Sequence, residues 1–224
     1  MKAIATFAAA MIAGGSAASA HHIWLEPDGQ QVRLYFGEFG ENLREASPGM
    51  LDKIEPQVKA GERALRVEKA ANGFVISGKL EASDSIVAED ARFPVFAQTR
   101  SLYWPAARLV TDRAVVAPVL ALDVVPAAGG KYQVSFKGRP LAKAKVEVLT
   151  PSGWSRELRT GEDGTIDVAL PWRGTYVIEV HHTDKTAGKR GEEAYDQVNY
   201  VTSLTVVQGQ GLDPLPALPA AKPH

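Results

Sequence analysis

The chain has 224 residues, 45% of them hydrophobic, which is enough for one or two small domains with their own cores. Its 25 basic and 26 acidic residues nearly balance, and the basic residues are not clustered in the sequence. Both observations argue against binding to nucleic acid or a membrane surface. There is no cysteine, so disulfide bonds and thiolate metal ligands are excluded.

The first 20 residues have the pattern of an export signal. Lys2 supplies the positive charge, residues 4–13 form a short apolar run, and Ala18-Ser19-Ala20 has the small residues of a cleavage site. The apolar run is too short for a permanent membrane helix. No comparable apolar stretch follows, so we expect cleavage after Ala20, a periplasmic protein beginning at His21, and no stable membrane span after cleavage.

Residues 21–118 are predicted to form a β-rich N-terminal domain, because short β-type runs are separated by turn residues and no segment sustains a helical period. At residues 47–54, a capping serine and a proline would allow one or two helical turns. Residues 92–111 are expected to form an irregular crossover with some strand. The expected strands are 22–25, 32–36, 64–69, 73–77 and 85–88.

Residues 119–208 show cleaner strand alternation and are predicted to form an antiparallel β-sandwich. The N-terminal region could alternatively add its strands to this sandwich and make one domain. Residues 209–224 form a Pro/Ala-rich tail that we predict to be disordered, and its final residue, His224, is assigned no role. The expected strands of the sandwich are 120–126, 131–137, 144–148, 165–168, 174–182 and 201–207.

Several short motifs follow one another between Gly138 and Val180. They are Gly138-Arg139-Pro140-Leu141 with Ala144 and Val146 after it, Glu162-Asp163-Gly164, Leu170-Pro171 and Gly174-Thr175-Tyr176. In this order they resemble the transthyretin-like, or carboxypeptidase-regulatory-like, β-sandwich. Such modules serve proteins of many functions, so the resemblance implies an all-β fold and says little about activity.

A second resemblance covers residues 18–207. It rests on the export signal and His21-His22-Ile23-Trp24, then Tyr35-Phe36-Gly37-Glu38, and finally His182-Thr183-Asp184 before Ser203-Leu204-Thr205. This order is similar to the NikM-like periplasmic family, which is associated with nickel and cobalt uptake. The resemblance implies a soluble accessory component whose partner is a metal-uptake transporter or an outer-membrane receptor. It also favours His182 and Asp184 as metal ligands.

Four of the five histidines form two adjacent pairs, His21-His22 and His181-His182. Cleavage after Ala20 would give His21 a free amine beside its imidazole, which together form a chelating unit. Adjacent strand residues point to opposite faces, so at most one of His181 and His182 faces a given site. The predicted site combines the His21 amine and ring with His182. Further candidate ligands are Asp184, His22, His181 and Glu38.

A nitrogen-rich donor set without thiolate suits Ni, Co, Cu or Zn. Intrinsic affinity alone favours Cu, whereas the family resemblance favours Ni or Co. The sequence therefore predicts a transition-metal protein that captures Ni, Co or Cu or delivers it to a transport system, and not an enzyme; no catalytic residue is assigned.

Two other functions remain open at this stage. An N-terminal histidine with a second histidine resembles the copper histidine brace of enzymes that cleave polysaccharides oxidatively. That activity calls for a flat aromatic surface, whereas only 8% of the residues are aromatic. Alternatively, the histidine pairs are ordinary surface residues of a structural or carbohydrate-binding β-sandwich without metal. A large separation between His21 and His182 would favour this third function.

Overall fold

The computed structural model describes residues 21–81 and 84–224, so the predicted export signal lies outside the described residues. The all-β prediction is confirmed: the described chain is built from strands in several mainly antiparallel sheets, with only short 3₁₀ turns as helical structure. One of these turns, Met50–Lys53, falls in the segment where helical turns were expected. Within the described residues no helix is long and apolar enough to cross a membrane.

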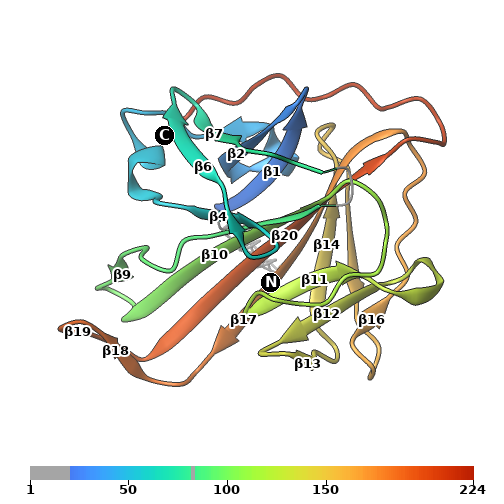
Figure 1. Cartoon of the computed structure of the whole chain (residues 1–224). Helices are drawn as coiled ribbons and strands as arrows, with labels where there is room; N and C mark the ends of the chain where they lie inside the picture. Colours follow the sequence, from blue (N-terminus) through green and yellow to red (C-terminus); the bar gives the residue numbers. More distant parts are fainter. Residues whose placement is uncertain (1–20, 82–83) are drawn as a thin grey trace, which may run out of the picture.

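A nine-stranded sheet runs through the middle of the molecule (Figure 1). Its three longest strands are β20 (Gln197–Gln208), β17 (Gly174–Asp184) and β10 (Ser101–Val110). Strands β10 and β20 pair in parallel from Ser101↔Gln197 to Val110↔Val206. Strands from both predicted regions therefore share one sheet. Its other members are β15 (Ser155–Arg159), β14 (Lys145–Leu149), β8 (Ser85–Glu89), β4 (Gln57–Ala60), β5 (Arg63–Ala64) and β9 (Val95–Phe96).

Two smaller sheets cover opposite faces of the central sheet. The N-terminal sheet contains β1 (His22–Asp28), β2 (Gln31–Glu38), β7 (Gly73–Ser77), β6 (Arg66–Ala70) and β3 (Leu43–Arg44). The C-terminal sheet contains β11 (Leu122–Pro126), β12 (Tyr132–Phe136), β13 (Arg139–Pro140) and β16 (Thr165–Ile166). A separate hairpin, β18 (Gly188–Arg190) and β19 (Glu193–Tyr195), lies near the ends of the long strands (Figure 1).

The alternation of side chains along the long strands explains these layers. On β20, Val201 packs in the core against the N-terminal sheet, whereas Leu204 and Val206 pack in the core against the C-terminal sheet. On β10, Tyr103 and Leu109 are in the first of these cores. Both faces of the central strands are apolar because both are covered.

One ion pair is buried between the central sheet and the C-terminal sheet. The Arg108 side chain is 2% exposed, and its Nε and Nη2 donate to the two carboxylate oxygens of Asp123 at 3.0 and 2.6 Å. Asp123 also accepts hydrogen bonds from the backbone amides of Val119 and Leu120 at 2.8 and 3.0 Å. The carboxylate thus holds the linker between the two regions against β11, and its charge is compensated where both side chains are buried.

Replacing Asp123→Asn should lower the free energy of unfolding by about 3–5 kcal/mol, because it leaves the Arg108 charge buried without a counter-ion. Urea denaturation followed by tryptophan fluorescence measures the change. Asp196→Asn removes an exposed partner of Arg100 and should alter stability little, since solvent screens that pair. Equal effects of the two substitutions would mean that Asp123 does not organise the core.

Candidate metal centre

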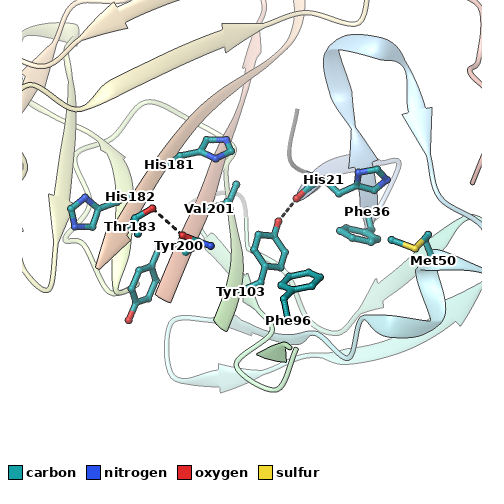
Figure 2. A pocket seen from close by; sticks show the side chains of 11 residues that line it. His21, Phe36, Met50, Phe96, Tyr103, His181, His182, Thr183, Tyr200 and Val201 are labelled. Atoms are coloured by element: carbon teal, nitrogen blue, oxygen red, sulfur yellow. Dashed lines mark hydrogen bonds between the residues drawn. The ribbon is translucent and has the colours of Figure 1, made fainter. Parts of the chain in front are cut away.

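His21 directly precedes β1 and lies against β10 of the central sheet. Strand β1 pairs with β2 along its whole length, from His22↔Gly37 to Asp28↔Gln31. The hydroxyl of Tyr103, on β10, donates a hydrogen bond to the carbonyl oxygen of His21 (Figure 2). The imidazole ring lies 5.2 Å from the ring of Phe36, centroid to centroid. The paired strand that follows it, the tyrosine and the ring contact therefore fix the position of His21.

Glu45, just after β3, is the carboxylate that His21 meets. Its backbone amide donates to the Phe36 carbonyl at 2.8 Å, and the residue is fully buried. Nε2 of His21 lies 2.6 Å from Glu45 Oε1. Sequence reasoning did not select Glu45, although a signal was present: alternation places it on the same buried side as Leu43, where an unpaired carboxylate would be costly.

The tail places a second imidazole on the same carboxylate. Residues 209–224, predicted to be disordered, run along the body in the structure as the red trace in Figure 1. Leu218 donates its amide to the Pro151 carbonyl at 2.8 Å, and Ala221 donates its amide to the Asn42 carbonyl at 3.1 Å. At the end of the tail, Nδ1 of His224 lies 2.7 Å from Glu45 Oε1, and its backbone amide donates to Oε2 at 3.1 Å.

His21, Glu45 and His224 therefore form a group that could hold a metal ion, with one ligand atom from each within 4.8 Å of the other two. Ligands about 2 Å from a shared ion lie about 3 Å from one another, so contacts of 2.6 and 2.7 Å need to open only slightly. Two imidazoles and a carboxylate form a donor set that proteins use for Zn and non-haem Fe(II), and imidazole also suits Cu and Ni.

The electrostatics of Glu45 favour its charged form. Burial acts to raise the pKa of this carboxyl, but hydrogen bonds from His224 and His21 outweigh burial, so the pKa is lowered from its ordinary value of 4.5. An ionised carboxylate at neutral pH is the form that binds a cation. Glu45 thus already carries the charge that a metal ion would require.

Glu38, a predicted ligand, lies on the other side of the His21 ring. Its Oε1 is 3.4 Å from Nδ1 of His21, while Nε2 faces Glu45. If Nε2 binds the ion, Glu38 orients the ring from behind, as carboxylates commonly do for metal-binding histidines. Glu38 is then a supporting residue instead of a direct ligand.

His22 and His181 meet at a different carboxylate. Glu179, on β17, is 5% exposed; His181 Nε2 hydrogen-bonds to its Oε1, and His22 Nδ1 lies 2.8 Å from Oε2. Burial acts to raise the pKa of Glu179, but the contacts with the two imidazoles outweigh burial, and the pKa falls well below its ordinary value. His22 is 1% exposed, and its Nε2 has no hydrogen-bond partner in the part of the chain that the structure describes.

His182 and Asp184 contact residues of the C-terminal sheet and the loop after it, away from the His21–Glu45–His224 group. The His182 ring packs 4.3 Å from that of Phe136 in the C-terminal sheet, and burial lowers its pKa. Asp184 accepts a hydrogen bond from Lys137 at 2.7 Å, which, together with Thr186, lowers its pKa to about 2. Figure 2 shows the His182 ring pointing away from His21. Among the described residues, the group that could hold a metal ion joins His21 to Glu45 and His224, and it does not include His182 or Asp184.

No protein-family model matches the chain, and neither does any curated protein. The class is therefore defined by fold and site alone: an all-β protein with a His-Glu-His group that could bind a metal ion.

The contribution of Glu179 to stability should be lost at acidic pH. Its folded-state pKa is lower than 4.5, so its stabilisation is complete above about pH 4.5 and is lost as the pH falls toward the folded-state value. The difference in urea midpoint between about pH 6 and about pH 3.5 should be smaller in Glu179→Gln than in the parent protein. Glu62→Gln, at an exposed position, is the control. An unchanged difference in Glu179→Gln would contradict this assignment.

Proposed function

We propose that this protein is a periplasmic metal-binding accessory protein that captures Ni, Co or Cu, or delivers it to a transport system. The observation that supports the proposal best is the convergence of His21 and His224, from the two ends of the described chain, on the fully buried carboxylate of Glu45. A buried carboxylate with two imidazoles as its side-chain hydrogen-bond partners offers a cation one negative charge and two nitrogen donors.

The arrangement also suits transfer of the ion. His21 is held by the hydrogen bond from Tyr103 and Glu45 by its burial, whereas the side chain of His224 is 62% exposed at the end of a tail without strand structure. A ligand on such a segment can leave with little disturbance of the core. The ion would then keep His21 and Glu45 while a partner, either a transporter or an outer-membrane receptor, offers its own ligands.

Export supports the same proposal. The pattern of residues 1–20 predicts cleavage after Ala20, which would make His21 the first residue of the exported protein. A resemblance to the NikM-like family along residues 18–207 favours Ni or Co, whereas the intrinsic order of affinities favours Cu. Metal identity is thus the first quantity to measure.

Isothermal titration with Ni, Co, Cu, Zn and Fe(II) should show one ion per chain for at least one of these metals. The protein is expressed with its own export segment, purified from the periplasmic fraction and checked by mass for cleavage after Ala20. Glu45→Gln and His224→Ala should each weaken binding by more than about 100-fold, because they remove ligands and not supporting groups. Affinity should also be lower at about pH 5.5 than at about pH 7.5, since imidazole binds a metal ion only when deprotonated.

His182→Ala is the matched control, because it removes a histidine from the opposite face of the central sheet. It should leave the affinity unchanged. If His182→Ala abolished binding while Glu45→Gln did not, the ion would occupy the site predicted from the sequence and not the His21–Glu45–His224 group.

Binding of the ion should also hold the tail more firmly. Amide hydrogen exchange at Leu218 and Ala221, both hydrogen-bonded to the body, should slow when metal is added, because His224 connects the tail to the ion. The amide of Val134, far from the site on β12, serves as the reference. Unchanged exchange at Leu218 and Ala221 in the metal-bound protein would exclude His224 as a ligand.

A further inference from the structure

A pocket of about 380 Å³ adjoins the metal group but extends away from it along the central sheet. One wall is formed by the side chains of Phe36, Met50 and Phe96, and the floor by Tyr103 and Val201 (Figure 2). The opposite wall comes from β17 and β20, where His181 and Asn199 line it. A pocket of this volume, with aromatic walls and a few polar groups, is typical of small-molecule sites.

The apolar wall fits a flat ring. Phe96 is 46% exposed, which leaves much apolar surface in contact with water. Its ring lies 6.3 Å from that of Tyr103, centroid to centroid, at an interplanar angle of 59°. Such tilted pairs accept a further aromatic ring by edge or offset contacts. Met50 adds a polarisable thioether that adapts to the shape of a ligand. Covering Phe96 would remove exposed apolar surface.

The polar wall offers one acceptor and one donor close together. His181 directs Nε2 to the buried Glu179, so in its neutral form the ring presents Nδ1 as an acceptor, and Nδ1 has no partner among the described residues. The Thr183 hydroxyl donates to the amide oxygen of Asn199 at 2.9 Å, which leaves the amide NH₂ of Asn199 as a donor. Because His181 pairs with Val201 and Thr183 with Asn199, His181 and Asn199 are diagonal neighbours on one face of the sheet.

The lining carries no fixed positive charge. No lysine or arginine lines the pocket in the described chain, and the nearest buried ionic group on this wall is the carboxylate of Glu179 behind His181. An anionic ligand would lose its hydration without a counter-ion. The favoured occupant is therefore neutral, aromatic, and equipped with a group that both donates and accepts a hydrogen bond.

We propose that this pocket binds a neutral aromatic molecule that carries a hydroxyl group. The ring packs against Phe96 and Tyr103, and the hydroxyl donates to Nδ1 of His181 and accepts from the Asn199 amide. The site does not depend on the proposed metal function, although His21 borders both the pocket and the metal group.

Titration with 1-naphthol as probe, followed by ¹H–¹⁵N chemical shifts on the metal-free protein, tests the proposal. Binding should shift the amides of Phe96, Tyr103, His181 and Val201. Phe96→Ala should weaken binding about two- to tenfold, the range that one aromatic contact supplies. Val207→Ala truncates another exposed apolar side chain, outside the pocket on β20, and should have no effect. Shifts that map elsewhere, or equal effects of the two variants, would overturn the proposal.

Two matched compounds test the hydroxyl separately. 1-Methoxynaphthalene cannot donate a hydrogen bond, and naphthalene-1-sulfonate carries the charge that the wall cannot compensate. Both should bind more weakly than 1-naphthol, and Asn199→Leu should reduce the preference for 1-naphthol over its methyl ether. Equal affinity for all three compounds would show an unspecific apolar patch and overturn the assignment. Loss of metal binding in Glu45→Gln with unchanged 1-naphthol binding would separate this site from the metal centre.

Discussion

The parallel pairing of β10 with β20 is the interaction on which the rest of the architecture depends. It joins a strand of the N-terminal region to the last strand of the C-terminal region, across most of the sequence between Val110 and Gln197. Parallel neighbours need a long crossover, and here the crossover is the entire C-terminal sandwich. Because of this ladder, both smaller sheets pack on the same central strands: β1 contacts β10 and β20, and β11 contacts β20 and β17.

The site predicted from the sequence, His21 with His182, differs from the observed His21–Glu45–His224 group because the two faces of β17 belong to different layers. His181 and His182 are adjacent on β17, and the strand period sends them to opposite layers, as expected from the sequence. His181 reaches Glu179 under the N-terminal sheet, while His182 packs on Phe136 under the C-terminal sheet. His21, which Tyr103 holds on the side of the N-terminal sheet, is thus separated from the ring of His182 by the central sheet itself.

Local patterns were sufficient for the all-β class and for the opposite orientation of His181 and His182, since both follow from a two-residue period. They were not sufficient for the metal group. Glu45 and His224 are 179 residues apart, and nothing local says that a Pro/Ala-rich segment will lie along Pro151 and Asn42. The backbone amides of the tail donate hydrogen bonds to loop residues and not to a sheet, so the tail shows no alternation of apolar and polar residues. Composition therefore favours disorder, and the final histidine has no visible partner.

The meeting of His21 and His224 at one carboxylate also has a topological consequence. The described chain starts and finishes at the same point of its surface, so a short peptide could join the two ends and new ends could be opened in an exposed turn, such as the one around Gly61. The same proximity constrains every handle attached to this protein. In a chain cut to residues 21–224, a tag on either end would begin beside Glu45, and a run of histidines there would compete with His21 and His224 for an ion at the carboxylate.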